Sequence, residues 1–290
     1  MNMRHILIMG GDARYLHVIE SLSRTDNQLY LIGFHHLSFK KHNVKHTELE
    51  HTNLSMMDAI ILPVAGTDEK GKVEITYADE SLFLTEQILS CTPKHCTIYT
   101  GTANDYLREI CLAANRKMVR LFDRDDVAIY NSIPTAEGAL KLAIEATEET
   151  IHSSNVCVLG FGRVGKTVAR LFHAVGAHVH VAARNSADLA RITEMGLTAI
   201  KTDQLNTVIG NIAICINTIP KLVIDENLIG NMSPSAVVID LASKPGGVDT
   251  ACAKQHHIKA IHALGLPGKT APKTAGKILA KVLIDSFNNE

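Results

Sequence analysis

Short apolar runs alternate with longer segments of helical periodicity along most of the chain. In the first half, five apolar runs predict buried strands at residues 5–9, 28–33, 59–62, 96–99 and 118–121. The segments between them predict helices, most clearly at residues 13–24, 79–90 and 103–115. Strands that alternate with helices are typical of a parallel sheet with helices on its faces.

The second half repeats this pattern after a predicted helix that starts near Pro134, where Ser132 is placed to cap it. Strands are predicted at residues 156–159, 178–182, 212–216, 237–241 and 260–263. The segment from Pro272 predicts one more amphipathic helix. Its apolar residues at helical spacing are Ala275, Ile278, Leu279, Val282 and Leu283. We expect this helix to pack on the first half of the chain.

Composition and charge narrow the functional class. The 290 residues suit two domains, and 29 basic against 30 acidic residues give a net charge of −1. No basic excess indicates nucleic-acid binding, and no apolar run reaches the length of about 20 residues that spans a membrane. The N-terminal apolar stretch is too short for a signal peptide. We therefore expect a cytoplasmic protein with neither nucleic acid nor membrane as partner.

The cysteines and histidines do not predict a metal site. The six cysteines are scattered without a zinc-type spacing, which indicates a reduced protein. Five histidines gather in one polar stretch but lack the spacing of metal ligands; they are His35, His36, His42, His46 and His51.

One glycine-rich motif lies between a predicted strand and a predicted helix. Gly160-Phe161-Gly162-Arg163-Val164-Gly165 follows a predicted strand and opens a predicted helix. In a dinucleotide-binding turn the first glycine permits the tight bend, the second lets the backbone approach a pyrophosphate, and the third allows helix and strand to pack. The helix N-terminus then holds the phosphates. The alternative is a glycine-rich turn without a ligand.

The end of the next strand selects the dinucleotide. An NAD site usually places an acidic residue about 20 residues beyond the motif to bind the ribose hydroxyls. No acidic residue occurs between Gly160 and Asp188, and the strand ends in Arg184-Asn185-Ser186. A guanidinium pairs with the 2′-phosphate of NADP, which a carboxylate would repel. These three residues therefore predict NADP, against the alternative of a solvated strand-end arginine.

Other strand ends are expected to contribute to the same cofactor site, because ligands bind at the carboxyl edge of open parallel sheets. The residues concerned are Thr218, Ile219 and Pro220, then Asp240, Leu241 and Ala242, and finally Pro267. Turn formation alone also explains each of these segments.

The predicted fold class is therefore α/β, with two Rossmann-like doubly wound parallel-sheet domains and an interdomain cleft. Residues 1–133 are expected to form a flavodoxin-like substrate domain on which the C-terminal helix, residues 271–290, packs. Residues 134–270 are expected to form the NADP-binding Rossmann domain.

Five longer stretches of the chain are distinctive: residues 10–14 (GGDAR), 122–135 (FDRDDVAIYNSIPT), 191–197 (RITEMGL), 265–268 (GLPG) and 271–276 (APKTAG). In these stretches the chain resembles one family, the dipicolinate synthase A subunits of endospore-forming Firmicutes. The resemblance implies an NADP-dependent oxidoreductase that acts on a CH–CH bond. Its product would be pyridine-2,6-dicarboxylate, made from a dihydro- or hydroxytetrahydro-dipicolinate of the lysine and diaminopimelate pathway. It also implies a role in the mother cell during sporulation with a flavoprotein-like B subunit, and we expect a homo-oligomer.

The architecture is more distantly similar to the 2-hydroxyacid and alanine dehydrogenases. Those families carry an arginine after a strand-end Asp-x-Ala/Ser and a histidine in a Thr-Pro-His turn. This chain has Lys244 and Lys273 at the comparable places. The difference argues against a carbonyl-reducing His/acid pair.

A dicarboxylate substrate requires cations, and its oxidation requires a proton acceptor. The candidate catalytic residues are Lys273, Lys244, Asp126 and His262, with Asp123 and Asp125 as further possible bases. The candidate substrate-binding residues are Arg14, Arg124, Ser132 and Thr135. Lys273 lies in the first turn of a helix, where the dipole disfavours a cation unless an anion is bound.

Each of these residues has a plainer explanation. The aspartates are also explained by capping and salt bridges, and His262 by a satisfied strand-end position. Arg14 could be exposed in a first helical turn, and Ser132 and Thr135 could serve only the helix start. Two other functions stay open: a 2-hydroxyacid or alanine dehydrogenase, and a non-catalytic NADP-binding scaffold for a flavoprotein partner.

Overall fold

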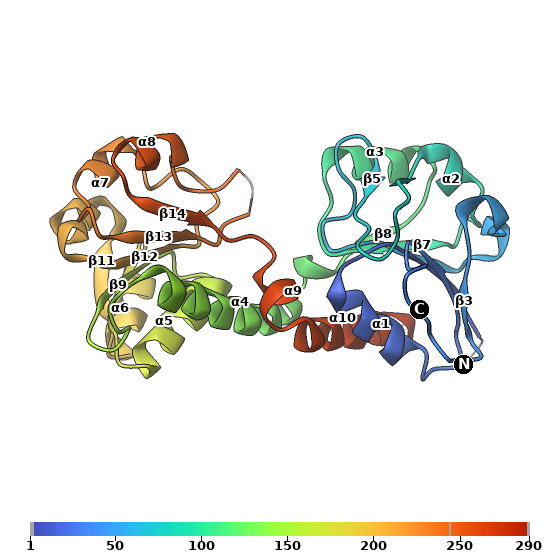
Figure 1. Ribbon diagram of the computed structural model, residues 1–290, viewed down its shortest axis with the longest axis horizontal. Helices are drawn as coiled ribbons and strands as arrows, with labels where there is room; N and C mark the ends of the chain where they lie inside the picture. The colour runs from blue at the N-terminus through green and yellow to red at the C-terminus, as the bar shows by residue number, and fades with distance from the viewer. Residues whose placement is uncertain (1–2, 244, 289–290) are drawn as a thin grey trace. The chain divides into compact units, whose positions relative to one another are not determined.

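The computed structural model describes residues 3–243 and 245–288, and the chain forms two compact units. The first unit comprises residues 1–128 and 271–290, and the second comprises residues 129–270. Each unit contains its own parallel six-stranded sheet with helices on both faces (Figure 1). This confirms the predicted class of two doubly wound α/β sheets.

The sheet of the first unit has the strand order β3-β2-β1-β4-β7-β8. Its strands are β1 (His5–Met9), β2 (Gln28–Ile32), β3 (Val44–His46), β4 (Ala59–Ile61), β7 (Thr97–Thr100) and β8 (Met118–Arg120). The unpredicted strand is β3, in which only Val44 is buried, so no apolar run marks it. With β3 at the edge the order becomes 3-2-1-4-5-6, which is the Rossmann order, and the flavodoxin-like prediction is corrected accordingly.

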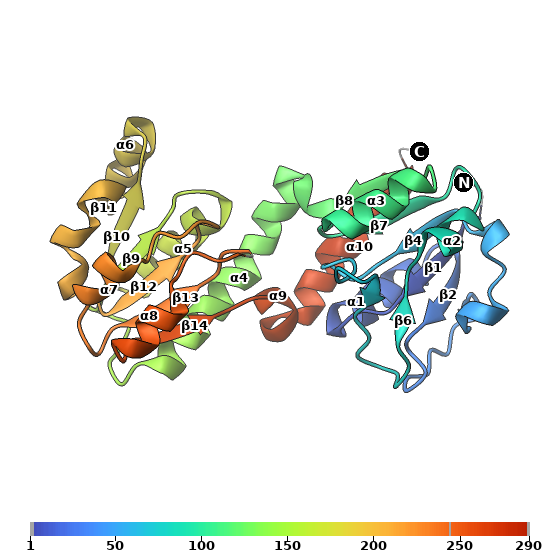
Figure 2. The ribbon, with the colours of Figure 1, turned by 90° about the horizontal axis from the view of Figure 1, so that it is seen from above.

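Helices cover both faces of this first sheet. On one face lie α1 (Ala13–Leu22) and α10 (Pro272–Asn288), and on the other α2 (Glu86–Ser90) and α3 (Asp105–Ala113). Figure 1 and Figure 2 show α10 beside α1. The two helices approach closely because Gly276 has no side chain: a Cβ there would clash with the carbonyl oxygen of Arg14. The apolar stripe of α10 then joins the core below the sheet.

The prediction of a helix over residues 79–90 is wrong for most of this range, since α2 covers only Glu86–Ser90. A short antiparallel pair, β5 (Lys72–Val73) and β6 (Leu82–Phe83), precedes α2. Leu82 and Leu84 are buried while Phe83 between them is exposed, which is the alternation of an extended chain. Thr85 then caps α2 by accepting from the Ile88 N–H.

The helix expected to start near Pro134 begins earlier. It is α4 (Asp125–Ala146), with Pro134 inside it and two aspartates in its first turn. Acidic residues are favourable there because they complement the positive end of the helix dipole. The predicted capping role of Ser132 is therefore wrong, since this residue lies within the helix.

The sheet of the second unit has the order β11-β10-β9-β12-β13-β14, again the Rossmann order. Its strands are β9 (Asn155–Leu159), β10 (His178–Ala183), β11 (Thr198–Lys201), β12 (Ile214–Asn217), β13 (Val237–Asp240) and β14 (Lys259–His262). One face packs on α4, α5 (Arg163–Ala174) and α6 (Ser186–Glu194). The other packs on α7 (Glu226–Gly230) and α8 (Thr250–Gln255), as Figure 1 shows.

Candidate functional site

The glycine-rich turn joins β9 to α5 at the carboxyl edge of the second sheet. Gly160 has a φ of +98°, which favours glycine, and a Cβ there would lie 2.6 Å from the Thr218 hydroxyl. That hydroxyl donates to the Leu159 carbonyl at 2.8 Å and so supports the turn from the end of β12. A Cβ on Gly165 would clash with the carbonyl oxygen of Gly160. The first and third glycines are thus required by packing.

Gly162 is different, because no packing contact requires it. It is the N-cap of α5, its backbone is extended, and a Cβ placed on it would meet nothing within 4 Å. No side chain at the N-cap accepts from the first N–H groups of α5. N–H groups at a helix start that no N-cap side chain satisfies, next to open space, fit a bound phosphate. Arg163 and Val164 form the first residues of the same helix.

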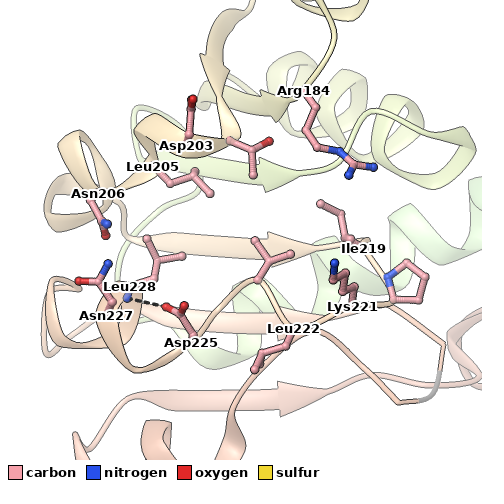
Figure 3. Close-up of a pocket in the computed structure, with 13 residues that line it drawn as sticks. Arg184, Asp203, Leu205, Asn206, Ile219, Lys221, Leu222, Asp225, Asn227 and Leu228 are labelled. Carbon is pink, nitrogen blue, oxygen red and sulfur yellow. Dashed lines mark hydrogen bonds between the residues drawn. The ribbon is translucent and has the colours of Figure 1, made fainter.

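A cavity of about 560 Å³ lies at the same edge of the sheet (Figure 3), and one of its lining residues, Ile219, also lies against Gly160 of the turn. Its volume lies within the range of small-molecule sites. Its walls come from the ends of β10 and β11 and from the connection between β12 and α7. Apolar side chains form much of it: Leu205, Ile219, Leu222, Val223 and Leu228. The polar lining residues include Arg184, Thr202 and Lys221, and the Thr202 hydroxyl is buried without a partner among the described residues.

Arg184 follows directly on β10 and lines the cavity with an exposed side chain. In the described part of the chain no carboxylate pairs with it. Asn185 caps α6: its Oδ1 accepts from the Asp188 N–H at 2.7 Å and its Nδ2 donates to Asp188 Oδ2 at 2.6 Å. Ser186 is the first residue of α6 and is exposed. The cap therefore fixes the backbone from which Arg184 extends.

The predicted residues at the other strand ends take different places. Ile219 and Pro220 line the cavity, whereas Thr218 supports the glycine turn. Leu241 is half-buried and Ala242 is buried, just beyond β13. Pro267 is buried in α9 (Leu266–Thr270).

Asp240, at the end of β13, is nearly buried and accepts several hydrogen bonds. Its donors are Asn217 Nδ2 at 2.8 Å, the Ala242 N–H at 3.1 Å and the Gly247 N–H at 3.0 Å. Asn217 is itself fully buried, on the neighbouring strand. The carboxylate thus fixes the loop after β13. Lys244, in that loop, lies outside the described residues.

His262 is the partner of Asp240 across the sheet. The two residues are paired in the register of β13 and β14, and His262 Nδ1 lies 3.4 Å from Asp240 Oδ2. The imidazole side chain is 38% exposed and the carboxylate 5%. A histidine whose Nδ1 lies beside a buried carboxylate, and whose ring is partly accessible, is suited to accept a proton, and this role of His262 stays a prediction.

Arg14 lies in the first turn of α1, in the first unit, and is 7% exposed. Its Nε and Nη2 donate to the carboxylate of Asp12 at 2.7–3.0 Å. Burial alone would lower the pKa of the guanidinium, but the hydrogen bonds and charge of Asp12 outweigh it and raise this pKa. Arg14 therefore stays charged, and its role in substrate binding stays a prediction.

Arg124 and Asp126 pair with each other near the start of α4. Arg124 Nε and Nη2 donate to the two carboxylate oxygens at 3.0 and 2.7 Å. This hydrogen bonding lowers the pKa of Asp126, and a carboxylate with a lowered pKa is a weaker base. Asp123 pairs with Arg120 at 2.5 Å, and Asp125 opens the helix. Because Asp123 and Asp126 are each paired with an arginine, His262 is the better candidate for the proton acceptor.

Three further candidates lie on helices. Ser132 is fully buried, where its hydroxyl donates to the Ile129 carbonyl and shares a 2.7 Å hydrogen bond with Thr167 of α5. Thr135 donates to the Asn131 carbonyl one turn back. Lys273 is exposed in the first turn of α10. Both hydroxyls are thus engaged inside the second unit, and all three substrate-related roles stay predictions.

One wall of the cavity was not predicted from the sequence. Thr202, Asp203, Leu205 and Asn206 follow β11, a strand that was not predicted. Only Ile200 of that strand is buried, so the apolar signal is weak, although the spacing from β10 suits a further edge strand.

Within residues 3–243 and 245–288, no histidine, cysteine or acidic cluster is arranged to hold a metal ion. Over the same residues, no helix meets the length and hydropathy needed to span a bilayer.

A Rossmann sheet with a glycine turn, a helix start without a side-chain cap and a cavity of about 560 Å³ at the same edge is typical of a nicotinamide-dinucleotide oxidoreductase. In agreement, residues 134–259 match the NAD-binding domain of the D-isomer specific 2-hydroxyacid dehydrogenases. Residues 5–122 match the N-terminal domain of the dipicolinate synthase A subunits. The chain belongs to the family of dipicolinate synthase A subunits, as the resemblance of its long strings had indicated.

Relatives support this assignment along nearly the whole chain. The dipicolinate synthase A subunit of Bacillus subtilis is 48% identical over 278 residues, which are 96% of this chain and 94% of the relative. The crystal structure of the Bacillus halodurans A subunit matches with a TM-score of 0.93 and 48% identity, covering 97% of both chains. The structure of the Bacillus subtilis A chain also gives a TM-score of 0.93, at 46% identity, covering 100% of this chain and 97% of that one. A transhydrogenase from Sinorhizobium meliloti, at 15% identity and a TM-score of 0.71, shares the fold.

Proposed function

We propose that this protein is the A subunit of a dipicolinate synthase and that it oxidises dihydrodipicolinate, or a species formed from its hydroxytetrahydro precursor, with NADP. The observation that carries the choice of NADP is Arg184, whose guanidinium lies at the end of β10 on the wall of the cavity and pairs with no carboxylate among residues 3–243 and 245–288. An acidic residue at this place would favour NAD. The likeness to the Bacillus enzymes supports the substrate class.

The reaction removes one hydride and one proton from the dihydropyridine ring and leaves an aromatic dicarboxylate. NADP, when bound, takes up the hydride. The N–H groups at the start of α5 would bind its diphosphate, and the turn residues Gly160 to Gly165 would bring it close. His262, oriented by Asp240, would accept the proton. Since the product is aromatic, positioning of the substrate is expected to carry most of the catalysis.

The two carboxylates of the substrate require fixed positive charge. We propose Lys273, Lys244, Arg14 and Arg124 for this role. Lys273 is the strongest of them on physical grounds, because it is a cation exposed at the positive end of a helix dipole. We further propose that the chain works with a B subunit, which the family resemblance implies to be flavoprotein-like, in the mother cell of a sporulating bacterium.

The proposed reaction can be tested directly with the purified chain and freshly prepared dihydrodipicolinate. With NADP we expect a rise in absorbance from NADPH and formation of dipicolinate in equal amounts. With NAD at the same concentration the rate is expected to be lower by at least about tenfold. A rise that requires added B subunit would favour the alternative in which this chain is a non-catalytic NADP-binding scaffold. No reaction even with B would contradict the proposed function.

Arg184→Ala is expected to weaken NADP binding by about 10- to 100-fold while changing NAD binding by less than about threefold. The loss corresponds to one charge-assisted interaction with the 2′-phosphate. Titration of each dinucleotide by calorimetry would measure both affinities. Arg191→Ala is the matched control, because Arg191 is an exposed arginine on α6 that pairs with Glu194 and does not line the cavity. Equal losses for NADP and NAD would refute the assignment of Arg184.

A further inference from the structure

A second cation without a counterion lies at the cavity. Lys221 lines it from the connection between β12 and α7, and its side chain is exposed. Figure 3 shows the Lys221 ammonium and the Arg184 guanidinium at the same end of the cavity, with Ile219 between them. Neither forms an ion pair with a carboxylate in the described part of the chain. Two unpaired cations on opposite walls of one cavity fit an anion of more than one charge.

The backbone that carries Lys221 is held on both sides. Asn217 Oδ1 accepts from the Ile219 N–H at 3.1 Å, and Asn217 Nδ2 donates to the Ile219 carbonyl at 3.0 Å. After Lys221, the N–H of Val223 donates to the Gly247 carbonyl at 3.0 Å. These contacts fix the loop at both ends, so the lysine extends from a prepared position.

Among the described residues, neither of the two carboxylates on the cavity wall forms an ion pair with these cations. Asp225 caps α7, where its Oδ1 accepts from the Leu228 N–H at 3.0 Å. Asp203 lies after β11, and Figure 3 shows its carboxylate turned outward from the cavity. The positive charge at the Arg184 end of the cavity is therefore available to a ligand.

We propose that Lys221 is the second cation that binds the 2′-phosphate of the cofactor, opposite Arg184. This inference rests on the proposed use of NADP. A phosphate monoester carries a charge of about −1.5 to −2 at neutral pH, and Arg184 supplies one positive charge. Lys221 brings the balance close to neutrality and adds donors from the other wall. Selectivity for NADP would then come from two residues, Arg184 and Lys221, that are 37 positions apart in the sequence.

The test uses cofactor fragments and needs no turnover. Adenosine 2′,5′-bisphosphate and adenosine 5′-monophosphate differ only in the 2′-phosphate, and calorimetry gives the affinity of the full-length protein for each. The wild type is expected to prefer the bisphosphate. Lys221→Gln should reduce this preference by about tenfold, the effect of one charge-assisted contact. Combined with Arg184→Ala, it should abolish the preference.

Lys201→Gln is the matched control, because Lys201 is an exposed lysine at the end of β11 that does not line the cavity. It should leave the preference within about twofold, since screened charges away from the phosphate contribute little. If Lys221→Gln behaves like this control, or weakens both fragments equally, the role of Lys221 is refuted while NADP use stands. If the wild type shows no preference at all, the use of NADP itself fails.

Discussion

Gly162→Ala is expected to weaken NADP binding by at least about 100-fold without unfolding the protein. The added methyl group meets no protein atom within 4 Å and the backbone there is extended, so folding is unhindered. It would occupy the space where the diphosphate approaches the N–H groups of α5, and two or more charge-assisted hydrogen bonds would be lost. Calorimetry measures the affinity, and chemical denaturation should show a change of less than about 1 kcal/mol in the free energy of unfolding.

Gly165→Ala gives the opposite result and serves as the comparison. Its Cβ would clash with the Gly160 carbonyl, so the helix and the turn cannot both keep their places. The free energy of unfolding is expected to fall by about 1–3 kcal/mol, as for other overpacked sites. Wild-type affinity for NADP in Gly162→Ala would show that the cofactor does not use this turn, and the proposed function would fall with it.

His262→Asn is expected to lower kcat by about 10²- to 10⁴-fold, the usual contribution of general base catalysis. Affinity for NADP should stay within about twofold, because no contact of His262 supports the glycine turn or the cavity. Asp240 keeps its three hydrogen-bond donors, so the loop after β13 should remain in place. Turnover would be followed by NADPH absorbance with the B subunit present.

His178→Asn is the control for this variant. His178 is exposed at the first residue of β10, at the opposite edge of the sheet from the strand ends, and should leave kcat unchanged. An unchanged kcat in His262→Asn would place the proton acceptor elsewhere. A loss of stability together with kcat would show that His262 serves the fold through Asp240.

Elements with a strong local signal were predicted correctly from the sequence. Elements whose bounds depend on tertiary contacts were missed or misplaced. Long apolar runs such as residues 5–9 and 156–159 are central strands, buried on both faces, and they were found. The edge strands β3 (Val-Lys-His) and β11 (Thr-Ala-Ile-Lys) were missed, because neither has a run of more than two apolar residues. Pro134 was interpreted as a helix start, but α4 begins at Asp125, and its turns before the proline are supported by burial of Val127 and by the Ser132–Thr167 hydrogen bond.

The residues of the candidate site also fall into two groups, those that local sequence signals indicate and those that only the fold brings together. The glycine turn and Arg184 follow from local rules, since a tight turn needs glycine and a strand-end guanidinium suits a phosphate. The pairing of His262 with Asp240 depends on the register of β13 and β14, which no local signal specifies. Likewise, only the fold places Lys221 on the same cavity as Arg184.

The alternation of strands and helices, the glycine-rich turn and the family to which the chain belongs were all found from the sequence alone. These features depend on side-chain periodicity and short-range backbone geometry, which are set by residues close together in the sequence. The tertiary structure decided the strand order, the partners of each buried charge and the walls of the cavity. Those features depend on contacts between segments distant in sequence, because only the closing of the sheet brings their strand ends to one edge.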